Sequence, residues 1–451
     1  MNNKFDVFVI GTGVAGGKIA SALSGAGKRV GICDYKEYGG TCALTGCNPK
    51  KVLTGWAESQ ARLQGYKENG VITNEPMLNW GNLIKHKEKF TSNVSKFKEK
   101  AFAKKNIEMF HGKGKFVGYN KLQVGDQVVE SDIIIIATGA TPRKLNIPGE
   151  DYVIAGEEFM SLTALPAEIL FIGGGYISFE LADVANQAGA KVTILERSFR
   201  SLSLFEPELV DLLTDNFNKN GIAIENDTAV VSVKKQGNKF LVEVESGKVF
   251  TTDLVVHGAG RVAHIAELEL DKGGIKTDSH GIVLNPNLQS VSNSSVYVAG
   301  DAVSDPKSFP LTPVASLEAR TVIHNILNDD KKTPNYTGTA SVLYTFPPVA
   351  TVGMLEADAK KQGIDYLVSY ADTSEMLPTQ RLALKISGYK IIIRKDNSQI
   401  IGAHLLGHHV DEVINLFALA IRNGFTAEQL KDNIWSYPSV SDVIDDMLNF
   451  S

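Results

Sequence analysis

Two of the three cysteines in this 451-residue chain, Cys42 and Cys47, stand five positions apart in a segment that runs from Gly39 to Lys51. If Cys42 to Cys47 form one irregular helical turn, the two sulfurs can come within bonding distance. A disulfide there would close a very small loop and constrain the unfolded chain little, so stabilisation is a poor reason for it. Reversible cycling between dithiol and disulfide is the better reason.

One other interpretation of the pair stays open on spacing alone, and a second is disfavoured. The thiols could be buried and unreactive, as many intracellular cysteines are, and Cys33 is expected to be such a core residue. Zinc would need four ligands, and no second pair of Cys or His stands at a suitable spacing. We therefore predict no metal site, and structural or surface roles for His404, His408 and His409.

A dinucleotide-binding pattern precedes the cysteines. Residues 5–10 are a β-branched, apolar run typical of a buried parallel strand, and an Ala-rich helix to about residue 25 follows a glycine-rich turn. A second strand over 29–33 ends at Asp34. Between a strand and a helix, such a turn brings backbone close to a pyrophosphate, and the acid can accept hydrogen bonds from a ribose. The turn glycines are Gly11, Gly13 and Gly16.

A second unit of the same kind lies further along the chain. A strand over 169–172 leads into a turn over 173–178, a helix, and a strand over 191–195 that ends in Glu196. Ser178 stands where the third small residue of the turn belongs. Two such units in one chain predict two dinucleotides, because internal duplication is much harder to explain by chance than either motif alone.

The two units, together with Gly-Gly-Thr-Cys and Gly-Cys-x-Pro-Lys-Lys around the cysteines, resemble the flavoprotein disulfide reductases. This class I pyridine nucleotide-disulfide oxidoreductase family includes glutathione reductase, dihydrolipoamide dehydrogenase and mercuric reductase, and the resemblance runs the whole length. It implies an α/β fold with two Rossmann-like dinucleotide-binding domains, for FAD and NAD(P), and a C-terminal α+β dimerisation domain. The implied ranges are 1–150 and 262–338 for the FAD-binding domain, 151–261 for the NAD(P)-binding domain and 339–451 for the dimerisation domain.

The resemblance also implies residue roles. Cys47 is expected to face the flavin, and Cys42 to attack the substrate. Lys50 is expected at the flavin, paired with Glu180, and Tyr176 is expected to cover the flavin until nicotinamide displaces it. The cofactor-binding positions that it implies are Gly11, Gly13, Gly16, Asp34, Gly40, Thr41, Lys50, Thr138, Gly139, Gly173, Gly175, Tyr176, Glu196, Arg197, Gly260, Asp301 and Thr312.

Several elements must position these residues. Residues 56–105 have apolar residues at helical spacing and are expected to form two long solvated helices. Strands are expected at 133–136, 254–257 and 296–299, the last ending at Asp301, which by resemblance contacts the ribityl chain of FAD. A helix beginning at about Thr312 should lie under the flavin. From about residue 340 the pattern changes to alternating strands and two helices.

The end of the strand over 191–195 leaves the nucleotide open between NADPH and NADH. Glu196 would bond the 2′-hydroxyl of NAD and repel a 2′-phosphate, whereas Arg197 and Arg200 could pair with that phosphate. By resemblance, Arg197 matches the first of two arginines that select NADPH in glutathione reductases, but Ser203 stands at the second. The balance favours NADPH slightly, or use of both.

The C-terminal region departs from the family pattern. Where relatives place a histidine before proline, to serve the thiol pair of the partner subunit, this chain has Tyr437, with Asp442 at the position of the orienting glutamate. Tyrosines titrate around pH ~10 and are poor bases near neutrality, whereas histidines are good ones. By resemblance, Tyr437 and Asp442 are the predicted catalytic positions. The departure predicts that thiol-disulfide exchange differs in rate from that of the family, or that the substrate differs. Glutathione itself is disfavoured, because Val14 and Ser21 stand at its family contacts.

Composition bounds the class of protein. Hydrophobic content is 43% and charged content 22%, as in ordinary globular proteins, and a net charge of −5 argues against nucleic acid or an anionic membrane as partner. No apolar run reaches the ~20 residues of a membrane span, and no signal-peptide pattern opens the chain. Three cysteines, an odd number, are not typical of a secreted protein held together by disulfides. We expect a cytoplasmic protein, and the resemblance implies a homodimer.

These observations favour an FAD-dependent NAD(P)H oxidoreductase that passes electrons through the Cys42–Cys47 disulfide to a low-molecular-weight disulfide. An alternative is a flavoprotein reductase of quinone, metal or oxygen acceptors, in which the thiols serve as an internal electron store. A third hypothesis is a redox-sensing protein that holds FAD without meaningful turnover.

Overall fold

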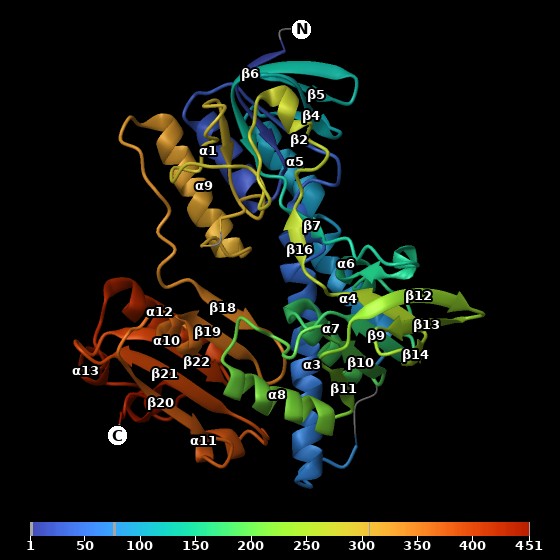
Figure 1. Cartoon of the computed structure of the whole chain (residues 1–451), viewed down its shortest axis with the longest axis vertical. Helices are drawn as coiled ribbons and strands as arrows, with labels where there is room; N and C mark the ends of the chain where they lie inside the picture. The colour runs from blue at the N-terminus through green and yellow to red at the C-terminus, as the bar shows by residue number, and fades with distance from the viewer. Residues whose placement is uncertain (1–2, 75–77, 306, 451) are drawn as a thin grey trace. The chain divides into compact units, whose positions relative to one another are not determined.

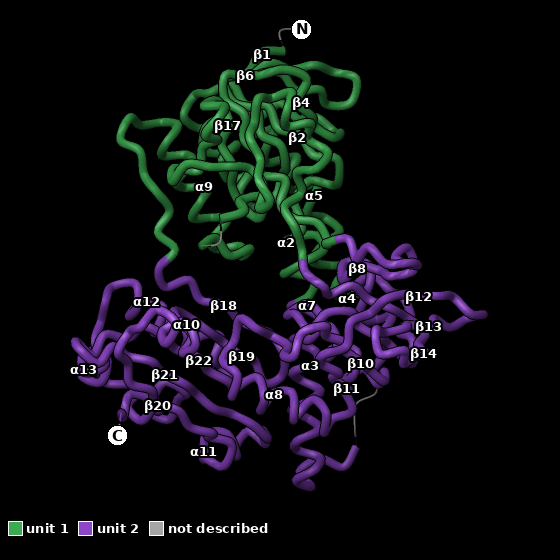
Figure 2. Tube along the Cα trace, viewed as in Figure 1, with its two compact units in different colours: residues 1–50, 85–143, 261–336 green, residues 51–84, 144–260, 337–451 purple. Residues whose placement is uncertain are grey.

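The computed structural model describes residues 3–74, 78–305 and 307–450 (Figure 1). The chain divides into two compact units (Figure 2). Unit 1 comprises residues 1–50, 85–143 and 261–336, and unit 2 comprises residues 51–84, 144–260 and 337–451. Within the described residues, helices that combine the length and the apolarity of a membrane span are absent.

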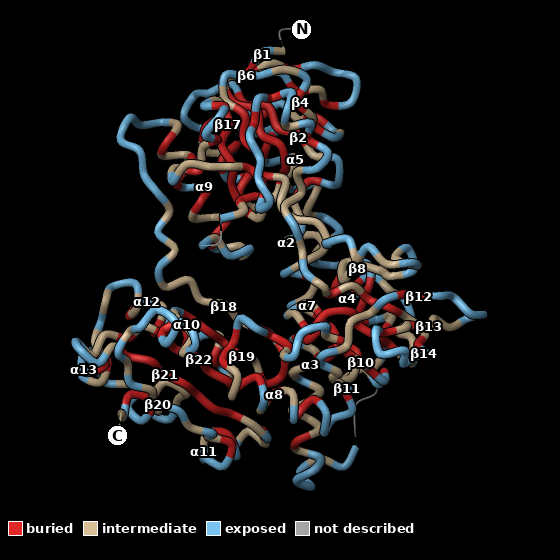
Figure 3. Tube along the Cα trace, in the orientation of Figure 1, coloured by how far each residue is buried: buried red, intermediate tan, exposed pale blue. Residues whose placement is uncertain are grey.

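Unit 1 is built around a seven-stranded sheet in which β3, β2, β1 and β6 follow one another in parallel. The carboxyl half of β6 pairs with β17, and its amino half pairs antiparallel with β5, which in turn pairs antiparallel with β4. β1, β2, β17 and the end of β6 are apolar and mostly buried, whereas the edge strand β3 buries only Phe110 (Figure 3). The strands are β1 (Lys4–Ile10), β2 (Val30–Asp34), β3 (Glu108–His111), β4 (Gly114–Gly118), β5 (Lys121–Val124), β6 (Gln127–Ile136) and β17 (Val296–Val298).

Helices α1 (Val14–Gly25) and α9 (Thr312–Leu327) pack against each other in unit 1. Helix α1 begins just after β1 ends, and α9 begins after the loop that follows β17. β7 (Ala140–Pro142) and β16 (Arg261–Ala263) form a short antiparallel pair. The chain leaves unit 1 just after β7 and returns to it at β16. The predicted strands at 5–10, 29–33 and 296–299 are present with boundaries changed by one residue, whereas the strand predicted at 133–136 is the end of the longer β6.

The prediction of two long helices over 56–105 was wrong. Three helices are present in the described part of this region, α3 (Cys47–Glu68), α4 (Trp80–Thr91) and α5 (Val94–Lys104). Helix α3 begins at Cys47 itself, two residues before Pro49. Proline is tolerated there because the first turn of a helix has no intrahelical partner for its N–H groups.

The central part of unit 2 is a parallel sheet of order β11-β10-β9-β15-β8. Between β11 and β15, the chain forms a separate three-stranded antiparallel sheet. It contains the second predicted dinucleotide unit, with the predicted strands at 191–195 and 254–257 reproduced without change. Its elements are β8 (Ile154–Ala155), α6 (Gly156–Phe159), β9 (Glu168–Ile172), α7 (Tyr176–Gln187), β10 (Lys191–Leu195), α8 (Pro207–Lys219), β11 (Ile222–Glu225), β12 (Val230–Gln236), β13 (Lys239–Val244), β14 (Val249–Thr252) and β15 (Leu254–His257).

The C-terminal part of unit 2 is an antiparallel sheet of order β18-β19-β22-β21-β20, on which α12 packs through β19 and β22. Only two helices were expected here, whereas five α-helices occur in the described residues, four of them six residues or shorter. The elements are β18 (Ala340–Leu343), β19 (Val349–Gly353), α10 (Glu356–Lys361), β20 (Tyr366–Asp372), α11 (Leu377–Gln380), β21 (Gly388–Arg394), β22 (Ile400–Leu406), α12 (Val410–Asn423), α13 (Ala427–Lys431) and α14 (Ile444–Met447).

Candidate active site

The two cysteines of the opening segment meet at one hydroxyl group in unit 1. Cys42 lies in the short helix α2 (Gly40–Leu44), and Cys47 is the first residue of α3. The Thr312 hydroxyl, at the start of α9, donates to Cys42 Sγ at 3.1 Å and lies 3.6 Å from Cys47 Sγ. Gly46 allows the reversal between α2 and α3, since a Cβ there would lie 2.8 Å from the Thr41 carbonyl oxygen.

The two sulfurs differ in their affinity for a proton. The pKa of Cys47 is lowered to about 6, first by a hydrogen bond from the Cys42 thiol, then by the Thr312 hydroxyl and the positive charge of Lys50. The pKa of Cys42 is raised, first by that same hydrogen bond and then by burial. At neutral pH the pair therefore holds a thiolate on Cys47 and a thiol on Cys42.

The cysteine segment packs directly on the first glycine-rich turn. Asp34 Oδ2 accepts hydrogen bonds from the Thr12 N–H at 2.9 Å and the Thr12 hydroxyl at 2.6 Å. The Thr12 hydroxyl oxygen in turn accepts from the Gly39 N–H at 3.1 Å. Gly40 has φ +73°, and a Cβ on it would lie 2.4 Å from the Cα of Gly13. The cysteine segment thus approaches the turn so closely that position 40 has room only for glycine.

The residues of unit 1 fit FAD. The hydroxyl oxygen of Thr138 is shielded from solvent and has no hydrogen-bond partner among the described residues, as expected for a group that serves a ligand. Asp301 follows β17, and burial raises its pKa while the charge of Arg261 opposes that change. Glu318 fixes the adjoining loop by accepting a hydrogen bond from the Gly300 N–H at 2.7 Å.

The second turn repeats the first one's geometry in unit 2. Glu196 Oε2 accepts from the Gly174 N–H at 2.6 Å, and its Oε1 accepts from the Ser198 N–H at 2.8 Å. Ser178 is accommodated because a glycine faces it: a Cβ on Gly258 would lie 1.8 Å from the Ser178 hydroxyl oxygen. The turn, its helix α7 and its acid therefore have the geometry expected of a second dinucleotide site.

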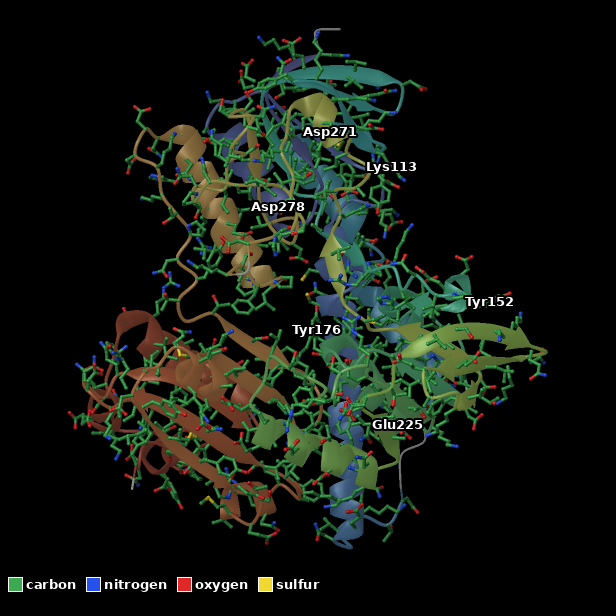
Figure 4. All side chains as sticks on the ribbon, in the orientation of Figure 1. Lys113, Tyr152, Tyr176, Glu225, Asp271 and Asp278 are labelled. Atoms are coloured by element: carbon green, nitrogen blue, oxygen red, sulfur yellow. The ribbon has the colours of Figure 1, made fainter. Side chains whose placement is uncertain are left out.

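The two arginines near the second turn differ in their surroundings. Arg197 is exposed, whereas Arg200 donates to Asp211 Oδ1 at 3.1 Å. Tyr176 lies at the N-terminal end of α7, with 39% of its surface exposed (Figure 4).

Two carboxylates on α7 hold the segment between β18 and β19. Glu180 accepts from the Tyr344 N–H at 2.9 Å, and Asp183 accepts from the Phe346 N–H at 2.8 Å. Burial raises the pKa of Asp183 to about 7. Lys50 belongs to unit 1 and Glu180 to unit 2, so the pair expected between them stays a prediction.

The C-terminal positions lie apart from the thiols along the chain. Tyr437 is 83% exposed, and one carboxylate oxygen of Asp442 is shielded from solvent without a hydrogen-bond partner in the described part of the chain. His404 is buried, with its Nδ1 2.7 Å from the Thr351 hydroxyl, and burial lowers its pKa to about 4. His408 Nδ1 lies 2.8 Å from Arg62 Nη2. Cys33 is fully buried, as expected of a core residue.

One group of carboxylates has the spacing of metal ligands in unit 2, formed by Glu206, Glu208 and Glu356. Lys390 already supplies positive charge there, because its Nζ lies 3.2 Å from Glu206 and 2.8 Å from Glu208 and also pairs with Glu356. We assign this group to an internal ion-pair network.

Sequence reasoning missed the contact of Thr312 with both sulfurs. By resemblance, Thr312 was expected as a cofactor-binding residue at the start of a helix under the flavin. The residues involved are 265 and 270 positions apart, so no local pattern indicates the contact. The hydrogen bond between Arg200 and Asp211 was also missed. The two residues are only 11 positions apart, but their spacing does not indicate that the side chains meet.

Comparison with known proteins places the chain in a family. Residues 5–319 match the family described as pyridine nucleotide-disulphide oxidoreductase, and residues 339–448 match its dimerisation domain. The chain belongs to this family. It is a flavoprotein oxidoreductase of disulfide-reductase type, and it uses FAD and NAD(P)H.

Individual relatives cover nearly the whole chain. A dihydrolipoyl dehydrogenase of Chlamydia muridarum is 27% identical, across 98% of this chain and 96% of the relative. A mercuric reductase of Staphylococcus aureus is also 27% identical, across 97% of this chain and 81% of the relative. The solved structure of the HOCl-induced flavoprotein disulfide reductase RclA of Escherichia coli has the same fold, with a TM-score of 0.88, 24% identity and coverage of 98% of this chain and 99% of that one.

Proposed function

We propose that Cys42 and Cys47 are the redox-active pair of this oxidoreductase and that they reduce a low-molecular-weight disulfide. The observation that carries the proposal is the meeting of both sulfurs at the Thr312 hydroxyl, on a segment packed against the first dinucleotide turn. A structural thiol pair has no need of a thiolate, whereas the pKa of Cys47 is lowered to about 6.

FAD, when bound, supplies two-electron transfer between the nicotinamide and the cysteine disulfide. Residues around the turn of 11–16, with Asp34, Thr138, Gly139 and Asp301, would hold it. In the thiol steps, the Cys42 thiol passes its proton to the Cys47 thiolate, and the Cys42 thiolate so formed attacks one substrate sulfur. The other substrate sulfur leaves as a thiolate and takes up the proton from Cys47. Cys47 then attacks the Cys42 sulfur, which releases the second product thiol with a proton and restores the Cys42–Cys47 disulfide.

The dimerisation domain supports a homodimer as the working form. In unit 2 the large side chains of Ile434 and Tyr437 are 99% and 83% exposed, as expected of a segment that a second copy covers. In that arrangement Tyr437 would serve as hydrogen-bond donor at the partner's thiols, oriented through Asp442. We propose a cytoplasmic location, where reducing conditions keep such a pair cycling.

Anaerobic titration of the purified holoenzyme with NADH and with NADPH tests the thiol-flavin couple. We expect a long-wavelength charge-transfer band between the Cys47 thiolate and FAD once two electrons have been added. The band should be absent from Cys47→Ser and retained in Cys33→Ala. Bleaching of the flavin without the band in the unaltered enzyme would mean that the thiols are not coupled to FAD.

We propose NADH as the preferred donor, which reverses the slight lean of the sequence towards NADPH. Both oxygens of Glu196 are held at the end of β10 by backbone N–H groups, so a 2′-phosphate would meet a fixed negative charge. Arg200 is paired with Asp211, which leaves Arg197 to bind such a phosphate.

The expected kcat/KM is at least about 10-fold higher for NADH than for NADPH, as one uncompensated charge contact would give. Glu196→Ala should narrow that ratio by weakening use of NADH, and Asp211→Asn should narrow it by freeing Arg200 for NADPH. Steady-state rates with both nucleotides measure the ratio. A preference of the unaltered enzyme for NADPH would refute this assignment.

A second candidate function is reduction of a metal ion or another acceptor that is not a disulfide. It is favoured by the mercuric reductase among the relatives and by tyrosine at position 437, where a base would serve thiol exchange. It predicts acceptor turnover that survives loss of Cys42.

A further inference from the structure

A positively charged helix lies beside the cysteine segment in unit 1. Residues 85–105 contain eight lysines and two glutamates, in a chain whose net charge is −5. Within α5, Lys96, Lys100 and Lys104 are spaced four residues apart, so their side chains share one face of the helix. All three are exposed, and none of them forms an ion pair in the part of the chain that the structure describes.

The stability of the helix does not explain this arrangement. Like charges four residues apart on a helix repel each other and destabilise it. The acid nearest to them in α5, Glu99, has other partners: its Oε1 accepts from the Ser95 hydroxyl at 3.5 Å and lies 3.9 Å from His111 Nε2. The three ammonium groups are therefore left for solvent or for a negatively charged ligand.

Helix α5 is held against the cysteine segment at its first turn. The Ser95 hydroxyl oxygen accepts from the Tyr38 N–H at 3.2 Å. A Cβ on Gly39 would lie 2.8 Å from Val94 Cγ1 of α5 and 3.3 Å from Leu44 Cδ1 of α2. Helix α2 carries the cysteine that attacks the substrate, and both helices belong to unit 1 (Figure 2). The charged helix and the thiols are thus parts of one packed surface.

The lysines of α5 lie close enough to act on a molecule at the thiols. A helix rises about 1.5 Å per residue, so Lys96, Lys100 and Lys104 stand within about 15 Å of the Val94 contact along its axis. The Debye length is about 30 Å at 0.01 M salt and about 8 Å at 0.15 M. Their charges therefore reach the thiol site at low salt and are largely screened at physiological salt. Phe97, 67% exposed and one turn after Val94, adds apolar surface on the same side of the helix.

We propose that the disulfide reduced by Cys42 and Cys47 carries negative charge, as carboxylate or phosphate groups, and that the lysines of α5 attract it to the thiols. The inference rests on the proposed function and names the substrate class of that site. A patch of opposite charge raises the rate of encounter, and this effect falls as salt rises. Lysine ammonium groups bind carboxylates and phosphates as point charges. The bonds formed and broken remain those of the thiol steps above.

Charged and neutral alkylating agents measure the field at the thiols without any substrate. Reduced holoenzyme is treated anaerobically with iodoacetate, an anion, or with iodoacetamide, its neutral counterpart, and mass spectrometry gives the rate at each cysteine. The ratio of the two rates cancels any change in thiol pKa, because both reagents react with the same thiolate. In the triple variant Lys96→Glu, Lys100→Glu, Lys104→Glu, the ratio of iodoacetate to iodoacetamide should fall about 3- to 10-fold at about 0.01 M salt.

The matched control is the triple variant Lys28→Glu, Lys235→Glu, Lys361→Glu, which makes the same change of net charge at exposed lysines of other elements. It should leave the ratio unchanged. Glutamine replaces glutamate at the three α5 positions if the glutamate variant fails to bind FAD, with an expected fall of about 2- to 3-fold. An α5 variant with the ratio of the unaltered enzyme would overturn the inference.

A series of small disulfides tests the charge of the acceptor. The series comprises dithiodipropionate, a dianion; hydroxyethyl disulfide, which is neutral; the bisphosphate ester of the latter; and cystamine, a dication. At about 0.01 M salt, kcat/KM of the unaltered enzyme should be at least about 10-fold higher for the two anionic disulfides than for the neutral one, and lowest for cystamine. The α5 variant should lose this preference and keep its kcat/KM for hydroxyethyl disulfide.

The order within the anionic pair distinguishes the two sources of charge. A preference for the bisphosphate ester would identify phosphate as the recognised group, and a preference for dithiodipropionate would identify carboxylate. An enzyme that favours hydroxyethyl disulfide or cystamine would overturn the inference. Absence of turnover with every disulfide would instead refute the proposed function, and the alkylation ratio would still report on the lysines.

Discussion

Replacing Cys42 by serine is expected to abolish disulfide reduction, by about 1,000-fold or more, while NADH still reduces the bound flavin. A serine oxygen can neither attack a disulfide at neutral pH nor close a disulfide with Cys47, whereas the hydride transfer to FAD does not involve residue 42. The serine hydroxyl can still donate to Cys47 as the Cys42 thiol does, and Lys50 and Thr312 stay beside it, so Cys47 keeps its thiolate. The variant should therefore show a charge-transfer band even without added reductant.

Two measurements check this expectation. Steady-state turnover with a panel of low-molecular-weight disulfides should fall to background, and stopped-flow reduction of the flavin by NADH should keep its rate within about threefold. Cys33→Ala is the matched control, because Cys33 is a fully buried thiol with a raised pKa outside the proposed chemistry. Full disulfide turnover by Cys42→Ser would remove Cys42 from the mechanism. Turnover that survives with metal ions or quinones, but not with disulfides, would support the second candidate function.

Changing Gly40 to alanine is expected to yield a protein that fails to retain FAD. The new Cβ would lie 2.4 Å from the Cα of Gly13, and the backbone at residue 40 has φ +73°, which an L side chain rarely adopts. Either the cysteine segment or the first dinucleotide turn must shift, and both belong to the flavin site. The ratio of flavin absorbance to protein in the purified variant measures the loss.

Gly27→Ala separates the two sources of strain. Gly27 has φ +83°, but a Cβ there meets nothing within 4 Å, so this variant suffers the backbone strain without the collision. It should bind FAD stoichiometrically and lose only about 1 kcal/mol of stability. Stoichiometric FAD in Gly40→Ala would show that the turn and the cysteine segment can separate without loss of the site, contrary to the packing described above.

Recognition of the two dinucleotide units needed only the sequence, because each is encoded within about 30 consecutive residues. An apolar β-branched run, glycines at fixed offsets and an acid at the end of the next strand restrict the backbone to one local arrangement. Asp34 and Glu196 illustrate this: both hold their turns through one carboxylate oxygen and accept from the backbone two residues further on through the other. The predicted strands were right to within a few residues for the same reason. The helices over 56–105 were less well predicted, because solvated helices end where tertiary contacts end.

By itself, then, the sequence determined that this chain binds two dinucleotides beside a pair of cysteines, since those features are local in the chain. Only the tertiary structure showed that the Thr312 hydroxyl lies against both sulfurs, because Thr312 stands 265 residues from Cys47 along the chain. It also decided that Arg200 is held by Asp211. Proton affinity and specificity depend on distances of a few ångströms between groups from different elements, and such distances are set by packing, which spacing along the chain does not record.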